Sequence, residues 1–241
     1  MNLRFSSVVV RALPYSLFYA IPKANHMIKN KEQYSYEERC DFAYKIMDYM
    51  RKQSRTITKV FGRENIPEES PFILYSNHQG KYDALGILTA LGKSCGVLWE
   101  ERQAKKIMGR QVCGLIDGVP IDLTDMRAKV KAISKVTEQI KAGQNMLIFP
   151  EGGYNNNGNN LQEFQAGCFQ CALRSQAPIV PVTIFDSFRA MNGNTFEKVT
   201  TQVHFLPPIS FEKYGRMSKQ EICEMVKNQI AGKLREICPA D

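Results

Sequence analysis

The sequence predicts an α/β fold in which a mostly parallel central sheet is flanked by helices and preceded by an N-terminal amphipathic helical segment. Short apolar runs alternate with stretches of helical periodicity from residue 72 onward. Residues 1–31 carry five basic side chains among apolar ones and no acidic side chain. The length of 241 residues suits one domain with a sizeable core. We therefore expect a helical segment over residues 1–58 and an α/β domain over residues 59–241.

The positive charge of the chain is concentrated near its N-terminus. Residues 1–60 hold eleven Lys and Arg against five Asp and Glu, a net of +6 out of the total of +8. Such a segment suits a nucleic acid or an anionic bilayer, but its apolar side chains are better placed to enter a headgroup layer than to read bases. We expect it to dock on a membrane lipid surface and not on nucleic acid. The alternative is that these apolar side chains pack on the core of the protein: Leu13, Tyr15, Leu17, Phe18, Tyr19 and Ile21.

The N-terminal segment is too short to cross a membrane. The uncharged run at residues 12–22 is about half of the ~20 residues that a spanning helix needs, and Pro14 and Pro22 interrupt it. We expect a peripheral, monotopic protein. Its seven cysteines are an odd, scattered set that favours a reducing cytosol, and hence the cytoplasmic face of the membrane. Cys168 and Cys171 form a lone C-x-x-C pair, which predicts two buried thiols and no metal site.

Capping residues and apolar spacing place the helices and strands. Ser35 and Glu38 form a capping box that begins an amphipathic helix over residues 36–52, and a second box at residues 218–221 begins a C-terminal helix. Helical spacing of apolar residues predicts further helices at residues 84–91, 101–108, 124–141 and 164–175. Short apolar runs predict strands at residues 72–75, 96–99, 119–121, 146–149, 179–184 and 203–206.

The first candidate motif is S-N-H-Q-G-K-Y-D at residues 76–83, between a predicted strand and the following helix. His78 and Asp83 are five residues apart and can meet through the turn. A carboxylate that holds one ring nitrogen of a histidine leaves the other nitrogen free to take a proton, and it stabilises the imidazolium that forms. A single histidine near a strand end is also compatible with a purely structural role.

The second candidate motif is F-P-E-G-G-Y at residues 149–154, directly after the predicted strand at residues 146–149. Glu151 lies at the edge of the sheet, and Gly152 and Gly153 allow a ligand to approach the backbone closely. Backbone amides in such a loop can also bind an anion. The alternative for this motif is an ordinary turn.

The order N-H-x-x-x-x-D and then F-P-E-G resembles the glycerolipid acyltransferase family, which includes the lysophosphatidate acyltransferases. The resemblance covers about residues 60–210 and includes the blocks at residues 62–67, 118–122 and 177–182. It implies that His78 is the general base on the acceptor hydroxyl and that Asp83 orients it. Asn77, Glu151, Gly152 and Gly153 are then expected to bind substrate. The resemblance implies transfer to 1-acylglycerol-3-phosphate, with acyl-CoA or acyl carrier protein as co-substrate and no cofactor.

Two positions depart from the family pattern. Relatives usually carry an arginine at the positions held here by Leu123 and Tyr154, and both arginines are thought to grip the acceptor phosphate. Nearby cations are expected to substitute: Arg127 first, then Lys81 and Lys105, although each is also compatible with a solvated surface charge. Two further hypotheses remain open. One is another lipid acceptor, such as an amino-acid-based lipid or another lysophospholipid, and the other is a non-catalytic membrane-binding module.

Overall fold

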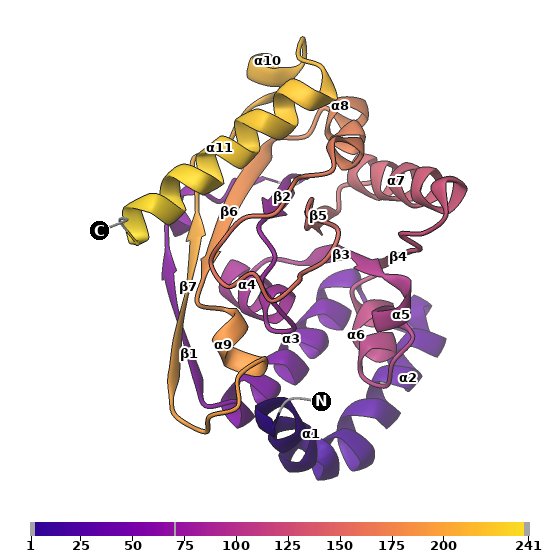
Figure 1. Cartoon of the computed structure of the whole chain (residues 1–241). Helices are drawn as coiled ribbons and strands as arrows, with labels where there is room; N and C mark the ends of the chain where they lie inside the picture. Colours follow the sequence, from indigo (N-terminus) through magenta and orange to yellow (C-terminus); the bar gives the residue numbers. More distant parts are fainter. Residues whose placement is uncertain (1–2, 70, 239–241) are drawn as a thin grey trace.

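The computed structural model describes residues 3–69 and 71–238, and its centre is one twisted sheet (Figure 1). Within these residues seven strands pair in the order β1-β7-β6-β2-β5-β3-β4. All neighbours run parallel except β6 and β7, so the predicted α/β class with a mostly parallel sheet is confirmed. The strands are β1 (Thr56–Phe61), β2 (Ile73–Ser76), β3 (Cys95–Glu100), β4 (Val119–Ile121), β5 (Asn145–Ile148), β6 (Ile179–Phe185) and β7 (Val199–Phe205).

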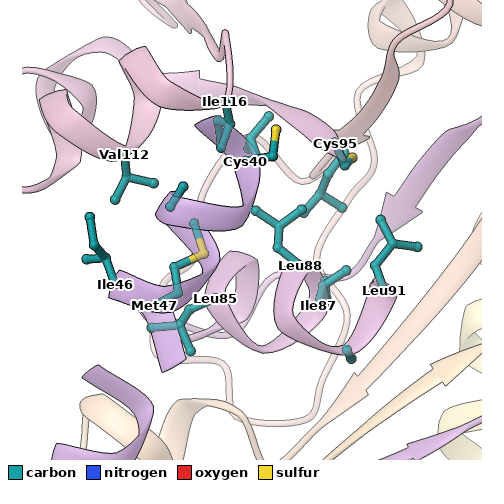
Figure 2. Packing of buried hydrophobic residues seen from close by; sticks show 14 of the residues in the cluster. Cys40, Ile46, Met47, Leu85, Ile87, Leu88, Leu91, Cys95, Val112 and Ile116 are labelled. Carbon is teal, nitrogen blue, oxygen red and sulfur yellow. The ribbon is translucent and has the colours of Figure 1, made fainter. Parts of the chain in front are cut away.

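Helices cover both faces of the sheet. On one face α3, α4 and α6 share a hydrophobic core, and Figure 2 shows Met47 of α3 close to Leu85 of α4 in that core. On the other face α7, α8 and α11 bury a second core. Because side chains alternate across a strand, successive residues pack in opposite cores: Leu74 lies in the first core and Ile73 in the second. These helices are α3 (Tyr36–Gln53), α4 (Asp83–Leu91), α6 (Gly109–Leu115), α7 (Met126–Lys141), α8 (Gln170–Ser175) and α11 (Lys219–Ile237).

The N-terminal helical segment continues through its two prolines. Helix α1 (Leu3–Tyr15) leads into a π-helical turn at Ser16–Ala20 and then α2 (Ile21–Lys29). The prolines were expected to interrupt the helical segment, but the chain continues through a wider π-helical turn between them. Such a turn allows a helix to bend where a proline lacks its backbone donor. Among the described residues, no helix combines the length and apolar character that a membrane span requires.

One basic residue of this segment is buried rather than free for a membrane. Arg4 is 2% exposed, and its guanidinium donates to four backbone carbonyls. These belong to Ala190, Thr195, Glu197 and Ser54, at distances of 2.8, 2.9, 2.9 and 2.5 Å. Arg4 therefore fastens α1 to the segment that joins β6 and β7. Lys31 is likewise engaged, in an ion pair with Asp117.

Several elements differ from the prediction. Strand β1 was not predicted, because as an edge strand it leaves Ile57 exposed and lacks a buried apolar run. The expected boundary between residues 58 and 59 lies inside β1. The helix expected at residues 101–108 ends at Ala104, as α5 (Glu101–Ala104). Helix α6 was not predicted and begins only after Met108, whose φ of 67° no α-helix continues. Two short helices were also missed: α9 (Phe188–Met191) and α10 (Phe211–Tyr214).

Candidate active site

The two predicted motifs meet because their strands are neighbours. Strand β2 pairs with β5 in parallel, with Tyr75 opposite Ile148. The segments that follow both strands therefore leave the sheet at the same edge, which is where open α/β sheets place their ligands. This arrangement brings His78 and Asp83 of the first motif beside Glu151 of the second.

The buried carboxylate of Asp83 pairs with one ring nitrogen of the partly exposed His78. His78 Nδ1 lies 2.6 Å from Asp83 Oδ2, and because an ionised carboxylate only accepts, the ring donates this bond. The side chain of Asp83 is 0% exposed, whereas that of His78 is 19% exposed. Among the described residues nothing hydrogen-bonds to Nε2 of His78. The pair is therefore oriented so that Nε2 can accept a proton from a bound molecule.

Asp83 is held by donors on both of its oxygens. Oδ2 accepts from the backbone N–H groups of Gln79 and Gly80, at 2.5 and 2.8 Å, in addition to His78. Oδ1 accepts from the hydroxyl of Ser187 at 2.5 Å. The loop thus wraps around the carboxylate at the N-terminus of α4, where a negative charge is stabilised by the helix dipole.

Glu151 supports the backbone of the loop at residues 77–82, between β2 and α4, which we call the histidine loop. Its Oε1 accepts from the His78 backbone N–H at 3.0 Å, and its Oε2 accepts from Nε2 of Gln162 at 2.6 Å. Burial is the largest influence on the carboxyl group and raises the pKa of Glu151, while these hydrogen bonds act in the opposite direction. Glu151 therefore joins the two motifs. Its contact with an acceptor stays a prediction.

Aromatic rings flank the His78 imidazole. Phe149 stacks on it with ring centroids 4.3 Å apart, and Tyr154 meets it edge-on at 4.9 Å. Gly152 provides the φ of 73° that the turn between them needs, and a Cβ on Gly153 would meet no atom within 4 Å. Tyr154 thus lies against the predicted base at a position where an arginine was expected from the family pattern.

The remaining predicted site residues lie in different surroundings. Asn77 is bonded to β6: its Nδ2 donates to the carbonyl of Ile184 at 3.0 Å, and its Oδ1 accepts from the Ile184 N–H at 2.8 Å. Lys81 lies in the histidine loop, with Nζ 4.4 Å from the ring centroid of Phe5. Burial lowers the pKa of Lys81, and Lys106 lowers it further.

Lys105 and Arg127 are not brought to the histidine. Lys105 pairs with Glu101 at 2.8 Å and lines a cavity of about 420 Å³ on the outer side of β4, whose lining does not include His78 or Glu151. The side chain of Arg127 is exposed in the first turn of α7, and within the described part of the chain no contact joins it to the first motif.

Four polar residues of the site were not predicted from the sequence. Gln79, Asn159, Gln162 and Ser187 hold the motifs in place, and Ser187 contacts Asp83 across 104 positions of the chain. No local pattern marks such residues, because their role comes from the packing of distant segments. Among the described residues, no group of three or more His, Cys, Asp or Glu is placed to hold a metal ion.

Comparison with known proteins agrees with this geometry. A family model described as Acyltransferase matches residues 57–185, more than half of the chain and including both motifs. The chain belongs to the acyltransferase family. The sequence resemblance and the predicted fold are thereby confirmed, while the roles of individual residues in this acyltransferase-family chain remain predictions.

Individual relatives of this acyltransferase-family chain are distant. Human 1-acyl-sn-glycerol-3-phosphate acyltransferase alpha is 26% identical over 182 residues, 74% of this chain and 64% of the human protein. A probable 1-acyl-sn-glycerol-3-phosphate acyltransferase of Mycoplasma pneumoniae is 24% identical over 220 residues, 86% of this chain and 82% of that protein. The chain thus spans less than two thirds of the length of the human relative.

A solved structure shares the fold over nearly the whole chain. The 1-acyl-sn-glycerophosphate (LPA) acyltransferase PlsC from Thermotoga maritima superposes with a TM-score of 0.79, covering 99% of this chain and 96% of that one. The sequence identity is 20%, so the similarity establishes the architecture alone.

Proposed function

We propose that the protein is a 1-acylglycerol-3-phosphate O-acyltransferase of phospholipid biosynthesis, using acyl-CoA or acyl carrier protein as donor. The observation that carries this proposal is the 2.6 Å bond between His78 Nδ1 and Asp83 Oδ2. The ring is partly exposed, and its Nε2 has no hydrogen-bond partner within residues 3–69 and 71–238. A membrane acyl acceptor offers a hydroxyl group as nucleophile, and that hydroxyl needs a base. His78 supplies it, and the family assignment supports the reaction class.

The reaction needs no covalent enzyme intermediate. Nε2 of His78 takes the proton of the acceptor hydroxyl as its oxygen attacks the thioester carbonyl. Asp83 stabilises the imidazolium that forms. The tetrahedral intermediate then collapses, the bond from carbon to sulfur breaks, and the imidazolium returns its proton to the departing thiolate. The products are an ester and a free thiol.

A different lipid acceptor is the second candidate. Tyr154, which lies against His78, and Leu123 occupy the two positions where arginines are expected to bind a phosphate monoester. Their replacement favours an acceptor with a larger or less anionic headgroup. An acceptor panel with one radiolabelled acyl-CoA separates the candidates. Preferred acylation of lysophosphatidate supports the proposal. If an amino-acid-based lipid or another lysophospholipid is acylated in preference, that lipid is the acceptor instead of lysophosphatidate. If no acceptor leads to thiol release, the result favours a non-catalytic membrane-binding module.

We propose Lys81 as the cation that binds the acceptor phosphate, because of the three candidates it alone lies in the same loop as His78, between it and Asp83. Replacing Lys81 by alanine is expected to raise the KM for lysophosphatidate about tenfold, equivalent to ~1.4 kcal/mol of lost binding, with kcat little changed. Arg127→Ala is the matched comparison, and Michaelis constants for both variants decide between the two residues. A larger effect of Arg127→Ala would restore the order expected from the sequence.

We further propose that the N-terminal segment docks on the cytoplasmic face of a membrane as a peripheral protein. One side of α1 and the following turn leaves its apolar residues in solvent, with Phe18 84% exposed, and exposed patches of this kind mark interaction sites. Lys23 lies beside this patch, since its Nζ donates to the hydroxyl of Tyr19 at 3.4 Å. Arg11 and Lys29 are further exposed cations of the same segment, and such cations suit anionic headgroups. The apolar residues of the patch are Leu3, Val9, Val10, Leu13, Leu17, Phe18 and Tyr19.

The substitution Phe18→Ser is expected to weaken binding to vesicles that contain phosphatidylglycerol by roughly tenfold or more, since burial of a large apolar side chain contributes about 1.5–3 kcal/mol. Sedimentation of protein with vesicles measures this. Ile57→Ser is the control, because Ile57 is 54% exposed but lies on β1 outside the patch. Equal losses in both variants would contradict docking through the N-terminal segment.

A further inference from the structure

Ser187 lies on the far side of the Asp83 carboxylate from His78. Its hydroxyl donates to Asp83 Oδ1 at 2.5 Å, while Asp83 Oδ2 faces His78 Nδ1 at 2.6 Å. Ser187 is 2% exposed and Asp83 1%, so neither is positioned by solvent. We infer that Ser187 is a positioning residue that holds Asp83 in the orientation in which it fixes His78. This inference rests on the proposed role of His78 as a general base.

Ser187 is itself held from its backbone. Its N–H donates to Oε1 of Gln79 at 2.8 Å, and Nε2 of Gln79 donates to Asn159 Oδ1 at 2.9 Å and to the carbonyl of Ile184 at 3.1 Å. Gln79 is next to His78 in the chain, and its own N–H also donates to Asp83. The histidine loop and the segment after β6 are therefore joined by several hydrogen bonds. Ser187 takes part in two of them, one with Gln79 and one with Asp83 at the end of the loop.

The turn that carries Ser187 has an unusual backbone. Only Asp186 and Ser187 separate the end of β6 from α9, and Asp186 adopts a φ of 57°, which is uncommon for a residue with a side chain. Such a conformation persists only where its surroundings fix it, and it is frequent at functional sites. Asn159 provides this support, because it accepts from the Asp186 N–H and donates to the Asp186 carboxylate, both at 2.9 Å.

The other end of the short helix is fastened too. Nε of Arg4 donates to the carbonyl of Ala190, in the last turn of α9, at 2.8 Å. Figure 1 shows α9 lying between the sheet and the start of α1. Ser187 thus precedes a helix that is hydrogen-bonded to α1 at its other end, while Ser187 itself is hydrogen-bonded to Gln79 and Asp83, which suits a residue that positions another side chain.

The physical role follows from the donors around Asp83. Oδ2 has three donors, whereas among the described residues Oδ1 has Ser187 alone. Without that hydroxyl, Oδ1 is a buried acceptor with no partner, and the carboxylate gains freedom to turn about its own axis. The hydroxyl is buried and lies on the side of Asp83 away from His78, so it is not placed to contact a molecule bound at Nε2 of the ring. Its loss should therefore lower kcat and leave both Michaelis constants unchanged.

Kinetics of Ser187 variants test the inference. Ser187→Ala is expected to lower kcat about tenfold, as the loss of a hydrogen bond to a charged group implies, with both KM values within about twofold of wild type. Ser187→Thr keeps the hydroxyl and should recover most of kcat. Ser175→Ala on α8 removes a hydroxyl that donates to a backbone carbonyl away from the site and should change nothing. A wild-type kcat in Ser187→Ala would overturn the inference.

Two further measurements separate positioning from a general structural effect. In an Asp83→Asn background Ser187→Ala should cause little additional loss, since it acts through Asp83; an equal tenfold loss in both backgrounds would overturn the inference. In proton NMR spectra the hydrogen-bonded Nδ1–H of His78 should resonate far downfield, shift or broaden in Ser187→Ala, and return in Ser187→Thr. An unchanged resonance in Ser187→Ala would also overturn it.

The NMR arm needs no substrate, so the two proposals fail separately. If the wild-type protein acylates no lysophosphatidate, the proposed acceptor is wrong, while the His78 resonance still decides the role of Ser187. If the wild-type protein is active and His78→Ala is not, but Ser187→Ala matches wild type in kcat and in its spectrum, the proposed function stands and the inference on Ser187 falls.

Discussion

Replacement of His78 by alanine is expected to lower kcat by about 10³-fold or more, the largest effect of any single substitution in this chain. General-base catalysis by a positioned side chain contributes roughly 10²–10⁴-fold. Among the described residues, no second base hydrogen-bonds to Nε2 of His78 and could replace it. Thiol release from acyl-CoA in the presence of lysophosphatidate measures the rate. The protein should remain folded, as its thermal midpoint can show, because the ring is partly exposed and its loss leaves Asp83 with the donors of Gln79, Gly80 and Ser187.

The chain offers a matched control for this substitution. His26 on α2 is exposed, and in the described part of the chain its ring hydrogen-bonds only to Asn30, the residue that follows this helix. His26→Ala should therefore retain normal turnover. If purified and folded His78→Ala protein kept normal turnover, His78 would not be the general base.

The pairing of His78 with Asp83 could be predicted from the sequence because the two residues are close in the chain. His78 and Asp83 are separated by one turn, and the apolar runs before residues 76 and 149 identify the two strands whose ends carry the motifs. Parallel neighbours in an α/β sheet then bring those ends together without further information. The capping boxes at Ser35 and Ser218 were equally local, and the structure shows both.

The residues that hold the pair could not be predicted for the opposite reason. Ser187, Gln79 and Asn159 act across about a hundred positions or through backbone groups, and no spacing in one segment encodes such contacts. Arg4 illustrates the same limit. Its sequence context is that of a surface cation, yet it is buried because four carbonyls of distant segments converge on it. Basic residues are normally exposed, so burial of this kind becomes visible only in three dimensions.

Asp83→Asn is expected to lower kcat by about 10²-fold or more while the protein stays folded, because the change removes the charge that stabilises the imidazolium but keeps the size of the side chain. The asparagine oxygen can occupy the Oδ2 position and accept from Gln79, Gly80 and His78. Its amide nitrogen then faces Ser187, whose hydroxyl is able to turn and accept. Turnover should fall with little change in the acceptor KM, since the Asp83 side chain is 0% exposed and not placed to contact a substrate.

Asp83→Ala separates charge from support. Alanine leaves the backbone donors of Gln79 and Gly80 and the hydroxyl of Ser187 without their acceptor in a buried site, and each such group costs about 1–3 kcal/mol. Urea unfolding should therefore show a clear loss of stability in Asp83→Ala and a small one in Asp83→Asn, although both variants lose turnover. If Asp83→Asn kept its turnover while Asp83→Ala unfolded readily, the carboxylate would serve the loop rather than the base, and orientation of His78 would need another source.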